Sequence, residues 1–296
     1  MVEKLLRIFP IIGILAAMLM FTVAADVAAA PKNVQWYWLS SNDKYGKYFD
    51  PASVTVTRKA TTNHGDVATE IEAWTKTAYS YEGAEETIAN YDIAEVLPNP
   101  ALLSYSLARL RVNPQNRTVL CLQENFYDAD NRVIWSRAEG NIKEITSQEF
   151  DEDFYAAIVD QVFRMGETAR IKADDRWRKL YEDKSVDGMV TVAKADTSTM
   201  RMKDTNLIYW EWLQRQGTDS RVIEIKFVKK SVNLAKGTEK VLLGKYWSPS
   251  TRWQDLEDDM EGRYRMISEK SPEYKGLEFL RAFAKGYSMW VNRYGL

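Results

Sequence analysis

Alternating apolar and polar positions predict antiparallel strands in the first half of the chain. The longest such segment, residues 67–81, has the period of two that places successive side chains on opposite faces of a strand. One face carries Val67, Ile71, Ala73, Thr75, Thr77 and Tyr79, and the other carries Glu70, Glu72, Trp74 and Lys76. We expect the first face to be buried and the second to face water.

Shorter strand patterns flank this segment and are separated by turn residues. They cover residues 34–39, 47–50, 54–56, 103–112, 117–127 and 133–137. A short helical excursion is expected over residues 84–96, because prolines at 98 and 100 cannot continue a helix. A second helix is expected to open at Ser147, with an apolar stripe of Phe154, Ala157, Ile158, Val162 and Met165.

The second half of the chain repeats residues of the first half at a constant displacement of 120 positions. Val112, Asn113, Thr118, Leu122 and Arg132 recur as Val232, Asn233, Thr238, Leu242 and Arg252. Such self-similarity is typical of one folded unit used twice. Further upstream, Asp196 matches Asp50, and a strand over 207–213 matches the long strand. The second copy lacks the excursion of residues 84–100.

Two helices are expected after the last hairpin of the second half. The first carries Leu256, Met260, Tyr264 and Ile267 on one side, and the second opens at Ser271, Pro272 and Glu273. The sequence therefore predicts an α+β protein of two tandem domains, each an antiparallel meander with a C-terminal helix packed on one face. The domains span residues 34–166 and 179–296, joined by a helical connector over 167–178.

Residues 1–30 have the pattern of a secretory signal peptide. Lys4 and Arg7 precede an apolar run over 9–25, and small residues follow at 27–30, with cleavage expected after Ala29. An uncleaved N-terminal anchor is the alternative. We expect export to the periplasm, the cell envelope or the outside, and no stable membrane span once the leader is removed.

Charge and cysteine content narrow the function classes. The chain has 40 basic and 42 acidic residues, so nothing favours nucleic acid or anionic lipid as a partner. Its single cysteine, Cys121, excludes an intrachain disulfide and lies in an apolar strand pattern. The single histidine, His64, lies in a turn, and no phosphate-binding glycine loop occurs. We therefore expect no cofactor, no metal and no enzymatic activity.

Several weaker patterns favour ordinary structure. Residues 128–132 resemble the start of a calcium loop but fit a hairpin turn better. The acidic run 257–261 fits a solvated helix face, and the glycosylation pattern at Asn116 lies in a tight turn. Four tryptophans form a candidate binding surface wherever they face solvent, although core packing accounts for such side chains more often: Trp36, Trp38, Trp74 and Trp135.

The strings WYWLSSNDKYGKYFDPASVTV, EAWTKTAYS and NRTVLCLQENFYDADNRVIWS resemble the surface-adhesin protein E-like domain of exported bacterial proteins. The resemblance covers residues 34–163 and implies one antiparallel sheet with a C-terminal helix on one face. The founding adhesin of that family is a surface lipoprotein that dimerises and binds host matrix and plasma proteins. This chain lacks the lipidation cysteine and a partner for Cys121.

Three functional hypotheses follow. The first is an exported, non-enzymatic binding protein whose partner is an envelope or host matrix protein. The second is a structural or assembly protein of the periplasm or envelope that dimerises through sheet edges. The third is a hydrolase with paired carboxylates in a cleft between the two halves.

Overall fold

The computed structural model describes residues 34–63, 65–256 and 263–295. The predicted signal peptide, His64 and the acidic run 257–261 lie outside the described residues.

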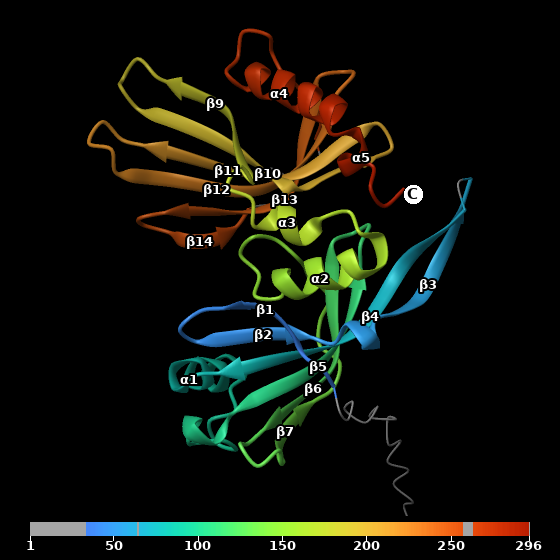
Figure 1. Cartoon of the computed structure of the whole chain (residues 1–296). Coiled ribbons are helices and arrows are strands. Elements are labelled where there is room, and N and C mark those ends of the chain that lie inside the picture. The colour runs from blue at the N-terminus through green and yellow to red at the C-terminus, as the bar shows by residue number, and fades with distance from the viewer. Residues whose placement is uncertain (1–33, 64, 257–262, 296) are drawn as a thin grey trace, which may run out of the picture. The chain divides into compact units, whose positions relative to one another are not determined.

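The first half forms an eight-stranded antiparallel sheet in the order β1-β2-β4-β5-β6-β7, with β3 paired to β4 and β8 paired to β6 (Figure 1). Its strands are β1 (Tyr37–Ser41), β2 (Tyr45–Phe49), β3 (Thr55–Thr62), β4 (Gly65–Tyr79), β5 (Tyr105–Asn113), β6 (Thr118–Tyr127), β7 (Val133–Arg137) and β8 (Lys143–Glu144). Short 3₁₀ turns η1 (Pro51–Ser53) and η2 (Pro100–Leu102) and helix α1 (Tyr81–Asn90) connect them.

The second half forms a seven-stranded antiparallel sheet in the order β9-β10-β11-β12-β13-β14, with β15 paired to β13. Its strands are β9 (Trp177–Lys184), β10 (Val190–Lys203), β11 (Asn206–Gln216), β12 (Val222–Asn233), β13 (Thr238–Ser248), β14 (Arg252–Asp255) and β15 (Arg265–Met266). The helices after α1 are α2 (Glu152–Phe163), α3 (Glu167–Ile171), α4 (Glu273–Gly286) and α5 (Ser288–Val291).

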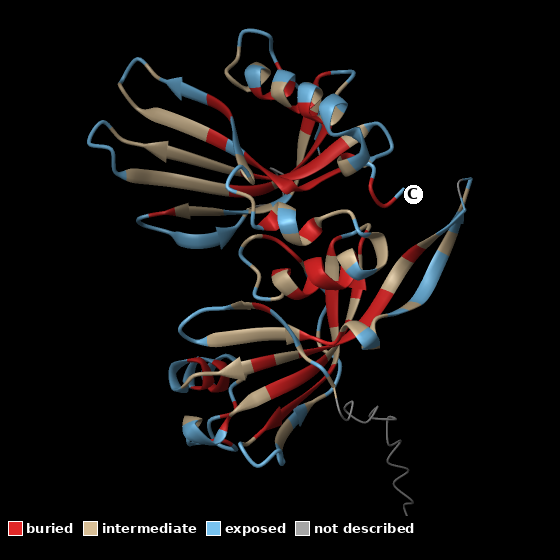
Figure 2. Cartoon of the chain, viewed as in Figure 1, coloured by how far each residue is buried: buried red, intermediate tan, exposed pale blue. Residues whose placement is uncertain are grey.

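Each sheet packs a helix against one face, as predicted. The core of the first half joins one side of α2 to Ile71, Leu110 and Val112 of the sheet, and buried residues are concentrated there in Figure 2. In the second half, α4 packs Leu277 and Leu280 against the sheet. Since full burial of one such side chain contributes about 1.5–3 kcal/mol, these contacts supply much of the stability of each half. The predicted α+β class and meander topology are confirmed.

The residues that recur at a displacement of 120 have matching structural roles. The Asn113 and Asn233 side chains each accept a hydrogen bond from the backbone N–H three residues later, at 2.8 and 2.9 Å. This contact shapes the turn between β5 and β6 in the first half and the turn between β12 and β13 in the second half. Leu122 and Leu242 are each the extra residue of a β-bulge. Leu122 has no partner on β5, where the register steps from Arg109 to Leu110. Leu242 has none on β12, where it steps from Lys229 to Lys230.

Asp196 also matches Asp50 in geometry. Each carboxylate accepts a hydrogen bond from the backbone N–H two residues later, at 3.0 Å in both copies. A hydroxyl side chain three residues after each aspartate accepts from the backbone N–H of Trp74 or Trp210. The second copy lacks the excursion as predicted, because a tight turn over 217–221 replaces α1 and η2.

One face of β4 is more buried than the sequence predicts. Glu72 is 4% exposed and Trp74 is 9% exposed, although both were expected to face water. Arg111 and Arg109 lie directly opposite these two residues on β5, and both pair with the Glu72 carboxylate. A carboxylate that is paired in this way can be buried at a cost that the ion pairs offset.

The segment after residue 147 also differs from prediction. The helix begins at Glu152, not at Ser147, and ends at Phe163, so Met165 lies outside it. The connector does not continue this helix, because Arg164 and Gly166 adopt left-handed backbone angles, with φ of 54° and 83°. Only α3 is helical in the connector, and the first strand of the second sheet begins at residue 177.

The helix expected through Tyr264 and Ile267 is wrong in its described part. Arg265 and Met266 form β15, and the Ile267 N–H donates to the Gly237 carbonyl at 2.8 Å. The same contact occurs in the first half between Ile145 and Arg117. In each half, a short strand after the hairpin, β8 or β15, pairs with the second strand of that hairpin. This pairing decides the structure of the segment, although the spacing of its apolar residues fits a helix. Met260 lies outside the described residues.

Candidate functional site

The four candidate tryptophans differ in their exposure to solvent. Trp74 is buried, and Trp135 is half-buried with its ring 5.1 Å from that of Phe126. Trp36 is half-buried just before β1. Trp38, on the edge strand β1, is 57% exposed. Of the four candidates, Trp38 is therefore the one that is largely exposed to solvent.

A pocket of about 480 Å³ lies on the helix-covered face of the first sheet. We call it the first-sheet pocket. Its aromatic walls are Tyr45, Tyr79, Tyr91, Phe150 and Phe154. Residues of β4, β5 and β6 form its floor, while α1 and the start of α2 bound it. Its size and its mixture of aromatic and polar lining are typical of sites that hold a ligand or an inserted side chain.

Glu124 is the buried acidic group of this pocket, with an exposed fraction of 7%. Its carboxylate accepts hydrogen bonds from Ser106 Oγ and Tyr91 OH, both at 2.9 Å, and from Arg137 Nε at 3.0 Å. Burial raises the pKa of Glu124, and the Arg137 guanidinium opposes that shift. The bulge at Leu122 turns Glu124 toward the pocket, because it reverses the alternation of faces along β6.

Asp151 is a second carboxylate in the pocket and precedes the first turn of α2. Its side chain makes no capping hydrogen bond, and none of its carboxylate oxygens bonds to another described residue. Burial raises the pKa of Asp151, and the positive charges of Lys143, Lys47 and Arg137 oppose that shift. Lys47 already donates to the Phe150 carbonyl at 2.5 Å. Asp151 therefore presents an acceptor that a bound group can use.

Cys121 also lines the pocket, and its thiol is not activated. Burial raises the pKa of Cys121 to about 11, with the Glu124 charge adding to the shift. The thiol is therefore protonated at neutral pH, and the thiolate is the form that reacts.

Alkylation of Cys121 should show this directly. We expect the rate with iodoacetamide to rise about tenfold per pH unit from pH 7 to 10, whereas an ordinary cysteine levels off above its pKa of about 8.5. Mass spectrometry gives the rate without ambiguity because the chain has one cysteine. Unfolded chain in denaturant is the control. A plateau near pH 8.5 in the folded protein would show that the thiol is not buried as described.

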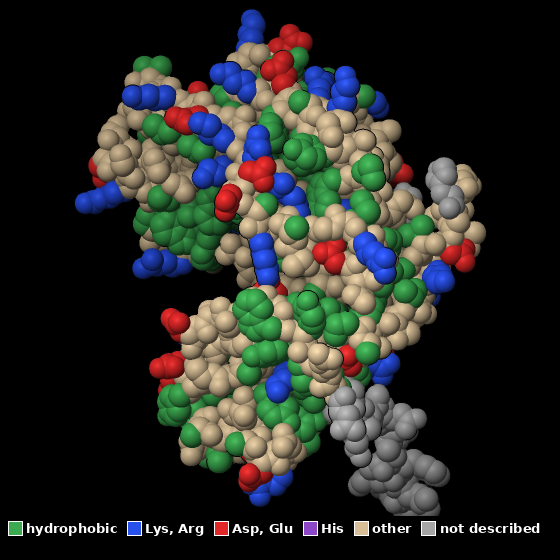
Figure 3. All heavy atoms as spheres, viewed as in Figure 1, with side chains coloured by type: hydrophobic (Ala, Val, Ile, Leu, Met, Phe, Trp, Pro, Cys, Tyr) green, Lys and Arg blue, Asp and Glu red, His purple; other side chains and the backbone are tan. Residues whose placement is uncertain are grey.

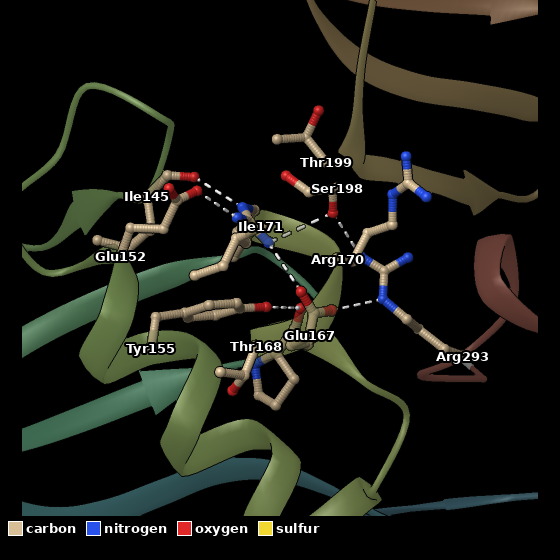
Figure 4. Close-up of polar contacts among 12 residues, drawn as sticks. Ile145, Glu152, Tyr155, Glu167, Thr168, Arg170, Ile171, Ser198, Thr199 and Arg293 are labelled. Carbon is tan, nitrogen blue, oxygen red and sulfur yellow. Dashed lines mark hydrogen bonds and ion pairs between the residues drawn. The ribbon is translucent and has the colours of Figure 1, made fainter. Parts of the chain in front are cut away.

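A buried ionic network joins the two halves (Figure 4). At its centre, Glu167 is fully buried and accepts from Arg117 Nη1 at 3.2 Å, Arg293 Nε at 2.6 Å and the Tyr294 hydroxyl. Burial alone would raise the pKa of Glu167, but Arg293 and Arg117 outweigh it and hold the pKa below its usual value. Arg293 also donates to the Ser198 carbonyl at 2.9 Å.

A second branch of the network centres on Arg176. This guanidinium donates to Glu152 of α2 at 2.7 Å and to Asp196 of β10 at 2.7 Å. Glu152 also accepts from Arg117 at 2.8 Å. Charges from both halves are thus mutually satisfied without solvent, and residues 31–296 form one compact unit. We interpret the network as structural, since every charged group in it already has a partner.

Two further features bear on the class of protein. In the described part of the chain, no group of three or more His, Cys, Asp and Glu side chains has an arrangement that would hold a metal ion. No described helix is both long enough and apolar enough to span a bilayer.

No family model matches the chain, and no curated protein matches it. The resemblance of residues 34–163 to the surface-adhesin protein E-like domain stays a prediction, and function is argued from the site.

Proposed function

We propose that this chain is an exported, non-enzymatic binding protein of the cell envelope, and that its first-sheet pocket receives a side chain of a protein partner. The observation that carries the proposal is the Asp151 carboxylate, which lies in an aromatic-walled pocket without a hydrogen-bond partner among the described residues. A half-buried carboxylate that bonds to no described residue is free to accept a hydrogen bond from a donor that enters the pocket.

The pocket also indicates what kind of side chain it accepts. The apolar walls favour a long hydrocarbon segment, and Asp151 favours a hydrogen-bond donor at its end. A lysine or arginine of the partner has both properties. Phe150, at 40% exposed, places an aromatic ring at the pocket where the partner's main chain would pass.

The chemistry of the pocket supports binding over catalysis. The Cys121 thiol is protonated at neutral pH, so it is a poor nucleophile. The Glu124 carboxylate already accepts hydrogen bonds from three donors of the protein, which favours a structural role for it over proton transfer to a substrate. The pocket at the junction of the halves has Asp204 as the one carboxylate among its described lining residues, so the paired-carboxylate hydrolase has no support there.

A binding experiment with a matched control tests the proposal. Asp151→Asn removes the charge with little change of shape, and Asp174→Asn makes the same change at an exposed position. Immobilised mature protein is exposed to envelope fractions and to purified host matrix proteins. We expect wild type and Asp174→Asn to retain one specific protein, and Asp151→Asn to retain it at least tenfold less, since about 1.4 kcal/mol suffices for that change.

Unfolding temperatures show whether lost binding in Asp151→Asn comes from the pocket or from a destabilised protein. Because burial disfavours the ionised carboxylate, we expect Asp151→Asn to unfold at a temperature no lower than that of wild type. Lost binding with retained stability would support the pocket as the site. Equal retention by all three proteins would contradict it.

The exposed edge of the first sheet favours a second candidate, an assembly role. β1 is an edge strand, and its Tyr37 and Trp38 side chains are 64% and 57% exposed. Unpaired strand edges with large apolar side chains are sites of strand pairing. On this hypothesis the mature protein is a dimer in light scattering, and Trp38→Lys makes it monomeric, while Val186→Lys does not. A wild-type protein that is strictly monomeric would contradict the assembly role.

A further inference from the structure

A second pocket, of about 460 Å³, lies where the two halves meet. We call it the Arg201 pocket. The turn between β5 and β6 contributes Gln115 and Asn116, and the second sheet contributes Arg201, Lys203 and Lys229. Ile208, Leu242 and Val291 give it an apolar side. Its described charged lining is thus predominantly basic, with Asp204 as the opposing charge.

Arg201 is buried but incompletely paired. Its exposed fraction is 9%, and its guanidinium lies 3.5 Å from the Asn116 carbonyl and 4.0 Å from a Glu144 oxygen. Charge-assisted hydrogen bonds are normally about 2.7–2.9 Å long. Glu144 is already engaged, because it accepts from Lys229 at 2.7 Å and from Trp210 at 3.1 Å. Several Arg201 donors therefore have no close acceptor among the described residues.

Arg117 shows that the fold can satisfy a buried arginine fully. Arg117 is 1% exposed, and its contacts to Glu152, Glu167 and the Ile145 carbonyl are 2.8, 3.2 and 2.9 Å. Arg201 lacks such partners. Burial lowers the pKa of Arg201, and the nearby Arg117 and Arg293 charges lower it further, while the Glu144 charge opposes the shift. The positive charge of Arg201 is the less compensated of the two.

Gln115 supplies an independent observation. Its amide nitrogen donates to the Ala68 carbonyl at 2.9 Å and lies 3.5 Å from the Tyr294 carbonyl, which fixes the orientation of the amide. The Gln115 Oε1 atom is buried and has no hydrogen-bond partner among the described residues. A buried acceptor without a donor costs about 1–3 kcal/mol, so a ligand that brings an N–H to Gln115, a lining residue of the pocket, would recover that cost.

We propose that the Arg201 pocket binds a small organic carboxylate that also carries an N–H donor and a short apolar group, as an N-acyl amino acid or the last residue of a peptide does. The carboxylate pairs with the Arg201 guanidinium, and Lys203 adds positive charge. The N–H donates to Gln115 Oε1. The apolar group packs against Ile208, Leu242 and Val291. The Arg201 pocket shares no described lining residue with the first-sheet pocket, so this proposal does not depend on the proposed function.

Calorimetry with N-acetyl-L-leucine and the full mature chain tests the proposal. We expect saturable binding in the millimolar range or tighter. The neutral N-acetyl-L-leucinamide should bind at least tenfold more weakly, and Arg201→Met should weaken N-acetyl-L-leucine at least tenfold. Absence of saturable binding, equal affinity of the neutral amide, or an unchanged affinity in Arg201→Met would each overturn the proposal.

A second variant keeps the test decisive if Arg201→Met fails to fold. Wild type should prefer N-acetyl-L-leucine over its ester analogue, which has oxygen in place of the N–H, and Gln115→Met should lose that preference. An equal preference in wild type and Gln115→Met would refute the role of Gln115 and with it the ligand class. An acetylated tripeptide ending in leucine separates the two sources of the ligand, because only a peptide-binding site retains it.

Discussion

Glu167→Gln should lower the free energy of unfolding by roughly 3–5 kcal/mol, the cost of breaking a buried ion pair by removing one partner. The substitution leaves Arg293 buried without an anion, since Glu167 is the carboxylate with which it pairs in the described chain. Chemical denaturation measures the change. Because the network joins the two halves, we expect one transition at reduced denaturant concentration.

The matched control is Glu182→Gln, which removes the same charge from an exposed pair with Lys179 at 2.9 Å. Its cost should stay below about 1 kcal/mol. The pH dependence gives a further check. The folded pKa of Glu167 lies below its unfolded value, so its stabilisation is present above that unfolded value, about 4.3, and is lost as pH falls through the folded pKa. Equal losses in both variants would contradict a special role for Glu167.

Gly83→Ala should displace α1 and distort the first-sheet pocket. A Cβ atom at this position would lie 2.2 Å from the Lys44 carbonyl oxygen, which is backbone and cannot move aside locally. Alanine improves helix propensity by about 1 kcal/mol, but overpacking typically costs 1–3 kcal/mol, and this contact is closer than most. We therefore expect net destabilisation of about 1–3 kcal/mol and loss of partner binding, because Thr87 and Tyr91 of this segment line the pocket.

Gly286→Ala provides the comparison, because a Cβ atom there would meet nothing within 4 Å. It should be neutral or slightly stabilising in thermal unfolding and neutral in binding. If Gly83→Ala were equally neutral, α1 would not be docked against the start of β2 as the structure has it.

Local patterns were sufficient to predict much of the fold. The recurrence of Asn113 as Asn233 indicated a repeated unit, and the structure shows the same local turn contact in both copies. Strand order followed from the meander of short, turn-separated segments. The apolar spacing near Ile267 was misleading, because the same spacing is compatible with a strand whose pairing to β13 lies outside the local window.

The pocket could not be predicted in this way. Glu124 faces it only because the bulge at Leu122 reverses the alternation along β6, and a bulge depends on the partner strand. The burial of Glu72 depends on its ion pairs with two arginines of β5, which are distant in sequence. The signals available were a glutamate inside an apolar strand and an aspartate just before a helix, and both patterns are common on ordinary surfaces.

Photo-crosslinking in intact cells tests the central claim, that the first-sheet pocket of an exported protein engages a protein partner. A photoreactive phenylalanine analogue replaces Phe150 at the pocket, or Val186, which is fully exposed in the second half. We predict a discrete adduct with one envelope or host protein from position 150, absent from position 186 and diminished by Asp151→Asn. No adduct from position 150, or the same adducts from both positions, would contradict the account.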